Sequence, residues 1–431
     1  MSNLSLSEQT WSLDHEALID LCQRHDNVLI IQDLDGVCMG LVKNPLTRMI
    51  DPAYIHAVRQ LDRHFYVLTN GEHIGDRGVN RIVEKALGKE TVAQKGLYLP
   101  GLAAGGVQWQ DRFGSVSHPG VSPQELEFLA AVPNQVSRRL RQSLPKDTHE
   151  DYQSYVQAAV LDNLVSPTAN LNVFYERFAN EIEVYSHLQQ QMQSLMAELL
   201  QQAVSQGLEN SFFVHLAPNL GKDEQGNEIL QPAQDLDAGT TDFQFMLKGG
   251  IKEVGVLVIL NRYYHYRTGQ YPLGEDFNAR QAPQSQSALL DLVKENFDPA
   301  QMPTMIGVGD TVTSKAVEEQ GELKFKRGGS DRNFLHLIQT LGQEFDTGNV
   351  VVYIDSSGGE VKNRKPLQVE AISHSPIGVS PQSGMGLSHQ VLSGPGDDRD
   401  TEDPLTLNVV FPRGHKQYIQ CFREIAQGRG Q

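Results

Sequence analysis

The chain has 431 residues, a formal net charge of −17 and 39% hydrophobic residues, enough for a packed core. An acidic balance of this size argues against general binding to nucleic acid or to anionic membranes, because both are polyanions. No apolar run reaches the roughly 18 residues of a transmembrane helix. The three scattered cysteines favour a reducing cytoplasm over a disulfide framework.

The N-terminal hundred residues predict a βαβ unit. The pattern indicates a buried strand at 28–32, a helix over 52–63 that Pro52 opens, and a second strand from Phe65 into the polar turn "TNGE". Strand, helix and strand within about 40 residues predict a parallel sheet. Shorter helices are expected at 14–25 and 78–88.

The middle of the chain changes character before the parallel-sheet pattern returns. A helical pattern dominates 123–208, and "SFFVHLAP" and "DFQFML" follow as two expected strands. Apolar strands that end in an acid return in "MPTMIGVGD" and "NVVVYID", and a Ser/Gly/Pro-rich loop is expected over 374–403. A strand in "LTLNVVFP" and a helix from about 415 close the chain.

This order predicts one α/β core with an insertion. The core is expected to be a Rossmann-like parallel sheet formed by residues 1–104 and 243–431. Residues 105–242 are expected to form an inserted, largely helical cap.

Polar residues collect where the predicted strands end. Ligands of parallel sheets sit at the carboxyl ends of the strands, and this edge is expected to gather Asp33, Asp35, Thr69, Asn70, Asp310 and either Lys248 or Lys252. Three converging carboxylates would repel one another unless a cation bound them. Hard oxygen ligands favour Mg²⁺, which can also bridge to a substrate phosphate.

The spacing of Asp33 and Asp35 suggests two separate roles. Residues i and i+2 of an extended segment point to the same side, so one carboxylate can attack a phosphorus atom while the other reaches the leaving oxygen. Asp33, as the attacking group, would stay ionised, and Asp35 would donate a proton to the leaving alcohol. An aspartyl-phosphate is a known form of covalent catalysis.

These motifs resemble those of the haloacid dehalogenase-like phosphohydrolases. The family's first motif matches "DLDGV" (33–37), its second matches "VLTNG" (67–71), and its fourth matches "IGVGDTVTS" (306–314). The resemblance covers roughly 25–95 and 243–345. It implies that Asp33 is the nucleophile and Asp35 the acid–base residue, that Asp33, Asp35 and Asp310 hold the metal, and that Thr69, Asn70 and a lysine bind the phosphate. An Asp at the second position is typical of the phosphatases of this family.

Two parts of the family pattern are ambiguous here. The motif lysine can be Lys248 or Lys252, and Lys252 fits better because it opens the next segment. The fourth motif usually carries a second acid three to five residues after Gly-Asp, where this chain has Thr313, Ser314 and Lys315. Asp331 could replace that acid, or could simply be the N-cap of a helix.

The position of the insertion narrows the resemblance to the members of the family that have a C2 cap. Only 33 residues separate Asp35 from Thr69, so a cap cannot lie there, and the insertion occupies the place of the family's C2 caps. Three segments, "IIQDLDGVCMGLV", "KGGIKEVGVLVILNRYYHYRTG" and "VGDTVTSKA" with "RGGSDRNFL", resemble the cyanobacterial glucosylglycerol-phosphate phosphatases. That resemblance implies hydrolysis of glucosylglycerol 3-phosphate to the compatible solute glucosylglycerol, and hence a role in salt tolerance.

Other functions remain open on sequence alone. The chain could be a sugar-phosphate-binding regulatory protein on the same scaffold, a phosphotransferase or mutase, or a phosphatase for sucrose or trehalose phosphate. The altered fourth motif favours the regulatory reading, and the intact Asp35 favours an enzyme. The sequence does not indicate the oligomeric state.

Overall fold

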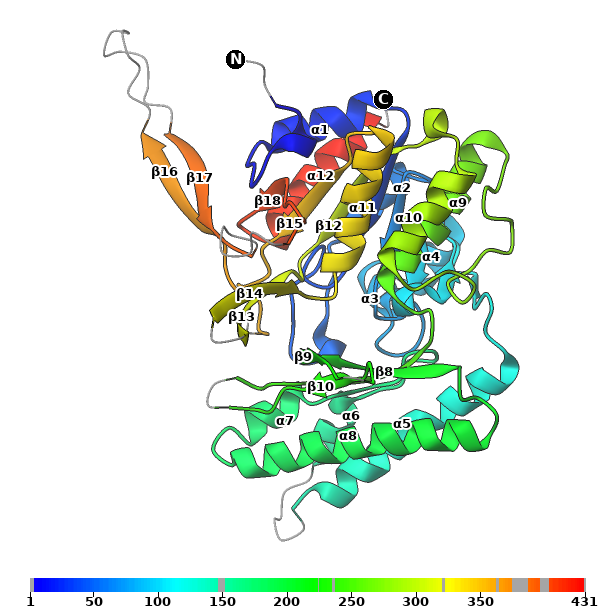
Figure 1. The fold of residues 1–431 in the computed structure, drawn as a ribbon, viewed down its shortest axis with the longest axis vertical. Coiled ribbons are helices and arrows are strands. Elements are labelled where there is room, and N and C mark those ends of the chain that lie inside the picture. The colour runs from blue at the N-terminus through cyan, green and yellow to red at the C-terminus, as the bar shows by residue number, and fades with distance from the viewer. Residues whose placement is uncertain are drawn as a thin grey trace.

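The computed structural model describes residues 4–145, 152–223, 225–234, 237–319, 322–361, 364–373, 387–395 and 403–429. Two bodies are visible, an α/β core and a cap below it in the view of Figure 1. None of the helices in these described ranges is both long and apolar enough to cross a membrane.

The core is built on one eight-stranded sheet, in the order β18-β15-β12-β1-β2-β3-β4-β5. The six strands from β18 to β3 are parallel, and β4 and β5 are antiparallel additions at one edge. The strands are β1 (Val28–Gln32), β2 (Phe65–Leu68), β3 (Gly101–Ala103), β4 (Gln108–Gln110), β5 (Val116–Ser117), β12 (Thr304–Gly309), β15 (Val350–Ile354) and β18 (Val409–Phe411).

Helices cover both faces of this sheet. The alternation of a strand sends Val28 and Ile30 to one face and Leu29 and Ile31 to the other, so β1 is buried on both sides and reads as a continuous apolar run. The first face packs against α1 (His15–Arg24), α2 (Pro52–Gln60), α3 (Val79–Leu87), α4 (Lys89–Lys95) and α12 (His415–Arg429). The second packs against α9 (Lys252–Thr268), α10 (Gln286–Asn296) and α11 (Arg332–Phe345).

The cap is a four-stranded antiparallel sheet backed by helices. Its strands are β6 (Val160–Leu161), β7 (Thr168–Asn170), β11 (Asp242–Leu247) and β8 (Phe212–Ala217), in that order across the sheet. Its helices are α5 (Pro123–Ser143), α6 (Gln153–Ala159), α7 (Asn172–Arg177) and α8 (Ile182–Ser205). A small ribbon of β9 (Asn219–Lys222) and β10 (Glu228–Leu230) continues from β8.

The strand pairing places both ends of the cap at positions that differ from the boundaries expected from sequence. Residues 108–117, assigned to the insertion, carry β4 and β5 and extend the core sheet. Strand β11, assigned to the core, pairs with β7 and β8 of the cap. The cap therefore spans about 118–248 rather than 105–242, because hydrogen bonding of these short strands is set by tertiary contacts that the local pattern does not contain.

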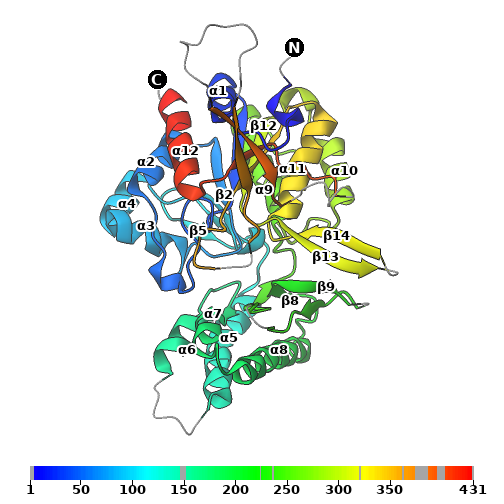
Figure 2. The same cartoon turned by 90° about the vertical axis from the view of Figure 1, so that its left-hand side faces the viewer.

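Two β-hairpins project from the core. The first, β13 (Thr313–Glu319) with β14 (Glu322–Gly328), follows β12 and points toward the cap, as Figure 2 shows. The second, β16 (Gln368–Ser373) with β17 (Leu387–Ser393), stands away from the body in Figure 1. Part of the predicted loop at 374–403 is thus strand β17, and residues 374–386 and 396–402 lie outside the described residues.

Short 3₁₀ turns complete the structure, at Leu6–Glu8, Pro45–Thr47, Ala104–Gly106 and Pro299–Gln301. The helix starts follow local chemistry. Asp51 caps α2 by accepting from the Ala53 N–H, and Pro52 takes the first position, where no intrahelical donor is needed. Ser122 and Glu125 form a capping box at the start of α5, which fixes where the cap leaves the core.

Candidate active site

Three central strands bring their polar ends together at one edge of the core sheet. Strand β1 pairs in parallel with β12 on one side and β2 on the other. Asp33 directly follows β1, Asp310 directly follows β12, and Thr69 directly follows β2. The predicted meeting of these three residues at the carboxyl edge is therefore realised in the structure.

A glycine lets the chain turn closely past Asp310. Gly36 has φ +80°, a conformation that side-chain-bearing residues rarely adopt. A Cβ at this position would lie 2.1 Å from Oδ2 of Asp310. The Gly in "DLDGV" is thus required both by the backbone conformation and by the space that the acid of the neighbouring strand occupies.

Lys252, the first residue of α9, is the lysine that reaches this edge. Its side chain is buried, with Nζ 3.1 Å from Oδ2 of Asp33 and 2.6 Å from Oδ1 of Asp331. Lys248 is exposed, and its backbone N–H donates to the Ser211 carbonyl. Of the two lysines left open by the sequence, the structure brings only Lys252 to the carboxylates.

Asp331 completes the cluster from the far end of the β13–β14 hairpin. It is fully buried, and its Oδ2 accepts from the backbone N–H groups of Asp310 and Thr311 at 2.9 Å each. The Thr311 carbonyl in turn accepts from the Asp331 N–H at 3.1 Å, which closes the base of the hairpin. Asp331 stands at the N-cap position of α11, but its side chain does not cap the helix.

Ser314 occupies a different place. It lies in β13, opposite Arg327 in the hairpin register. The carboxylate in contact with Lys252 and with the Asp310 backbone is that of Asp331, so the structure puts Asp331, and not Ser314, beside the acid of the fourth motif.

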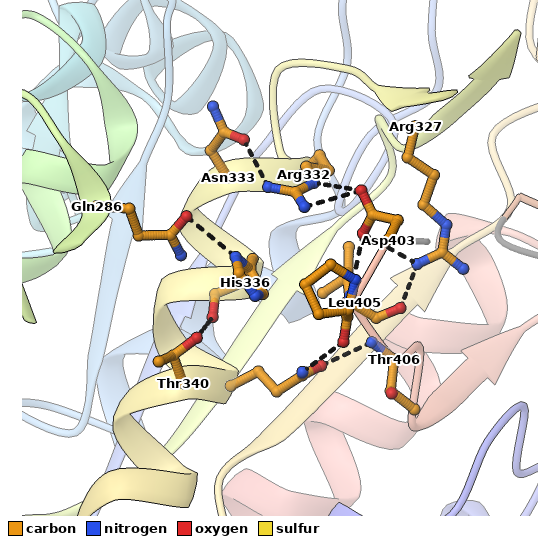
Figure 3. Close-up of polar contacts among 11 residues, drawn as sticks. Gln286, Arg327, Arg332, Asn333, His336, Thr340, Asp403, Leu405 and Thr406 are labelled. Atoms are coloured by element: carbon orange, nitrogen blue, oxygen red, sulfur yellow. Dashed lines mark hydrogen bonds and ion pairs between the residues drawn. The ribbon is translucent and has the colours of Figure 1, made fainter. Parts of the chain in front are cut away.

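Asp403 connects the segments before and after Asp331, and Figure 3 shows its contacts with Arg327 and Arg332. Oδ2 of Asp403 lies 2.9 Å from Nε and 2.8 Å from Nη2 of Arg332, at the start of α11. Its Oδ1 lies 3.7 Å from Nη1 of Arg327, at the end of β14, and the same guanidinium donates to the Leu405 carbonyl. The residues on either side of Asp331 are therefore held to one acid.

The cluster is electrostatically incomplete. Asp33, Asp310 and Asp331 each offer an oxygen within 4.8 Å of the others. In the described part of the chain, Oδ1 of Asp33 and Oδ2 of Asp310 are buried without a hydrogen-bond partner. Buried polar atoms are normally paired, and three carboxylates with one ammonium leave two negative charges. A divalent cation fits this deficit in charge and in ligand type.

The pKa values of the acids and of Lys252 point to the same lack of positive charge. Burial raises the pKa of Asp33; Lys252 opposes this rise, and the neighbouring acids add to it. Burial also raises the pKa of Asp310, which Arg364 partly counteracts. For Lys252 burial works toward a lower pKa, but Asp33 and Asp331 outweigh it and the pKa is raised. The lysine is thus held charged, and the acids need further positive charge to ionise.

Asp35, expected among the metal ligands, lies outside the three-carboxylate group. The chain turns away from the strand direction after the buried Leu34, and the Asp35 carboxylate lies 3.1 Å from Nε of Arg48. Arg48 also donates to the Arg77 carbonyl at 3.3 Å. Arg48 could not be foreseen from sequence, because it follows Asp35 by thirteen residues in a segment without a recognisable element.

The expected phosphate-binding residues follow β2. Thr69 is buried, and its Oγ1 accepts from the Gly71 N–H at 3.2 Å, while Asn70 is half-buried. Glu72, which sequence reasoning missed, comes next. Its buried carboxylate accepts from the backbone N–H groups of cap residues 164, 165 and 166 at 2.6–2.8 Å. The loop that follows β2 therefore contacts the cap directly through the Glu72 carboxylate.

Comparisons with known proteins place the chain in a family. A curated glucosylglycerol-phosphate phosphatase from Synechocystis sp. is 56% identical over 429 residues, covering 98% of each chain. The C-terminal domain of Candida albicans trehalose-6-phosphate phosphatase is 10% identical with a TM-score of 0.45, covering 97% of this chain and 98% of that one. An Aspergillus fumigatus trehalose-6-phosphate phosphatase is 12% identical with a TM-score of 0.33, covering 82% and 91%. The model of the family described as glucosylglycerol-phosphate phosphatase matches residues 27–426, and the chain belongs to that family.

Proposed function

We propose that this protein is a Mg²⁺-dependent phosphomonoesterase that hydrolyses glucosylglycerol 3-phosphate to glucosylglycerol and phosphate. The observation that carries the chemistry is the cluster at the ends of β1 and β12, where two buried carboxylate oxygens lack a partner beside a charged lysine. The substrate follows from family membership and from the name of the 56% identical relative.

Asp33 is the proposed nucleophile. Its carboxylate would attack the substrate phosphorus, forming an aspartyl-phosphate as the P–O bond to the alcohol breaks. Lys252 lies 3.1 Å from Oδ2 of Asp33 and so restricts rotation of the carboxylate. The same ammonium would stabilise charge on the phosphoryl oxygens, together with the Thr69 hydroxyl and the Asn70 amide.

Asp35 is the proposed acid–base residue. It would give a proton to the leaving alkoxide and then take one from the water that hydrolyses the aspartyl-phosphate. Arg48 lies 3.1 Å from the Asp35 carboxylate. For the leaving oxygen to reach Asp35, Arg48 would have to exchange this contact for another acceptor, and a bound phosphate is one candidate.

Asp33 and Asp310 would hold the cation, with Asp331 beside them. The donor set of carboxylate oxygens suits Mg²⁺. When bound, the ion would supply the positive charge that keeps Asp33 ionised and would offset charge on the transferring phosphoryl group. Asp331 fixes the backbone of Asp310 and Thr311 through its two accepted hydrogen bonds.

A p-nitrophenyl phosphate assay with and without EDTA tests the reaction class. We expect activity that chelation removes and Mg²⁺ restores. Activity that survives exhaustive chelation would overturn the metal-dependent mechanism. No activity under any metal would favour the regulatory protein on the same scaffold.

A second assay tests the substrate. A site built to hydrogen-bond hydroxyls rejects analogues that lack them. We expect kcat/KM for glucosylglycerol 3-phosphate to exceed that for glycerol 3-phosphate and glucose 6-phosphate by at least ~10². A preference for sucrose phosphate or trehalose phosphate would keep the mechanism and change the substrate. A cytoplasmic location is part of the proposal, and all three cysteines are buried free thiols.

A further inference from the structure

The cap sheet has two chemically different faces. Alternation along β11 sends Phe243, Phe245 and Leu247 to one side and Asp242, Gln244 and Met246 to the other. The register carries the second face across the sheet: Asp242 lies opposite Asn170 of β7, and Gln244 lies opposite Thr168 of β7 and His215 of β8. The second face is thus polar over its central rows.

The apolar face is covered by helices of the cap. The ring of Phe128 in α5 stacks on Phe212 at 5.1 Å and on Phe245 at 5.9 Å. Figure 1 shows α5 and α8 on the side of the sheet away from the core, and Figure 2 shows the same layering from the side. The polar face therefore looks toward the core.

Asp242, the first residue of β11, supplies a carboxylate to the polar face. Its Oδ1 accepts from Nδ2 of Asn170 at 2.8 Å, and its Oδ2 accepts from Oγ1 of Thr241 at 3.1 Å. Oδ1 of Asn170 accepts from the N–H and Nδ2 of Asn172, which fixes the orientation of the Asn170 amide. Each Asp242 oxygen keeps a further lone pair, so the carboxylate is oriented and can still accept.

His215 and Gln244, which lie on the same face, can also form hydrogen bonds with a ligand. Nδ1 of His215 lies 3.0 Å from both Glu228 oxygens. In neutral imidazole this contact keeps the proton on Nδ1 and makes Nε2 an acceptor. Among the described residues, no group hydrogen-bonds to the side-chain amide of Gln244. Phe213 and Met246 continue the same face as an apolar surface.

Hydrogen bonds join cap and core beside the catalytic edge. Glu72, three residues after Thr69, accepts from the backbone N–H groups of residues 164, 165 and 166, which lead into β7 of the polar face. Burial raises the pKa of Asp242, and its hydrogen bonds from Asn170 and Thr241 oppose this rise. The strand that carries Asn170 therefore begins next to the loop that follows Thr69.

We propose that the polar face formed by Asn170, His215, Asp242 and Gln244 binds the hydroxyl groups of the glucosylglycerol part of the substrate, with Asp242 as the main acceptor. This inference rests on the proposed function. The face offers an oriented carboxylate, an imidazole acceptor and an amide that can donate and accept, the groups that a neutral polyol needs. The phosphate is excluded from this face, because Asp242 and Glu228 would repel it, and it belongs beside Lys252.

The test compares two substrates in one enzyme. kcat/KM is measured for glucosylglycerol 3-phosphate and for p-nitrophenyl phosphate, which has no sugar hydroxyls, in the wild type, Asp242→Asn, Gln244→Ala and Glu176→Gln. Glu176 is a matched carboxylate in the cap that contacts Lys43 of the core at 3.1 Å. It separates the loss of a core–cap ion pair from the loss of a sugar contact.

We expect the ratio of the two kcat/KM values to fall roughly 10- to 100-fold in Asp242→Asn, because a hydrogen bond to a charged group is lost. Gln244→Ala should lower it about 5-fold, as expected for a neutral hydrogen bond, and Glu176→Gln should keep the wild-type ratio. Glucosylglycerol as a competitive inhibitor should weaken in Asp242→Asn by a similar factor, while inorganic phosphate should not.

The outcomes separate the inference from the proposed function. If the wild type shows no preference for glucosylglycerol 3-phosphate, the proposed function fails. If the preference is present and both Asp242→Asn and Gln244→Ala retain it, this inference is overturned. Equal losses on both substrates would also overturn it, since Asp242 would then be structural. Should Asp242→Asn not fold, Gln244→Ala still decides, because its amide supports no contact among the described residues.

Discussion

Asp331→Asn is the substitution that most directly tests the composition of the metal site. The variant keeps the size of the side chain and removes one of three negative charges whose oxygens lie within 4.8 Å of one another. Its amide oxygen can still accept from the Asp310 and Thr311 N–H groups, so the base of the hairpin stays closed. The amide nitrogen then faces the Lys252 ammonium, which loses its 2.6 Å partner.

The expected effect on metal affinity follows from Coulomb's law. The carboxylate oxygens lie within 4.8 Å of one another, so this distance is taken as the upper limit for an ion held among them. Two unit charges at that separation interact by about 3.5 kcal/mol at an effective dielectric constant near 20, the value that suits protein sites. A divalent cation feels twice the interaction of a unit charge, and water and side-chain relaxation reduce it again. We therefore expect the Mg²⁺ concentration for half-maximal activity to rise on the order of 10²-fold.

The assay is a Mg²⁺ titration of chelator-treated protein, followed by activity and, independently, by calorimetry. Ser314→Ala is the control, since Ser314 is the other residue that could replace the missing acid of the fourth motif. Unchanged Mg²⁺ affinity in Asp331→Asn, or a larger loss in Ser314→Ala, would refute the assignment of Asp331.

Four further substitutions and a pH series extend the test. Asp33→Asn should abolish turnover and leave a folded protein, measured by activity and circular dichroism; more than a few per cent of residual activity would exclude the aspartyl-phosphate. Lys252→Ala should lower kcat by ~10²–10³ and Lys248→Ala far less. Steady-state kinetics that showed the reverse order would assign the motif lysine to Lys248. Glu72→Ala leaves three buried cap N–H groups without their acceptor, so urea unfolding should show a loss of about 3 kcal/mol or more; an unchanged midpoint would contradict the contact. In metal-free protein burial raises the pKa of Asp33 from 3.8 to about 8, so between pH 4 and 8 the folded state holds a proton that the unfolded chain has lost. The free energy of unfolding, measured by thermal denaturation, should therefore fall as pH rises from 4 to 8, by at most ~1.4 kcal/mol per pH unit. Asp33→Asn should flatten this pH dependence.

The central strands and their acids could be predicted because their signals are local. Strand β1 is a short apolar run that ends in Asp33, and β12 is another that ends in Asp310. Parallel pairing then brings such strand ends to one edge of the sheet, whatever the intervening sequence. Lys252 was also recoverable, because the first residue of a helix that follows the insertion has a fixed place beside that edge.

The residues that depend on distant contacts could not be predicted. Arg48 reaches Asp35 from a stretch without periodicity, and Glu72 accepts from backbone N–H groups of the cap that lie more than ninety residues away. The polar face of the cap sheet combines strands β7, β8 and β11, and only their register reveals that Asn170 and Asp242 are neighbours. Spacing along the chain does not encode this register.

Asp331 shows how a motif can be kept in space while it is lost in sequence. Asp331 follows Asp310 by 21 residues instead of the usual three to five, yet the antiparallel pairing of β13 with β14 returns the chain to where it left the sheet. Gly309 permits the close approach, since a Cβ there would lie 2.7 Å from Oδ2 of Asp331. Asp403 then holds Arg327 and Arg332 on both sides of the returning acid. An insertion between the two acids is tolerated because the hairpin closes on itself, so its length does not alter the position of the carboxylate that Lys252 requires.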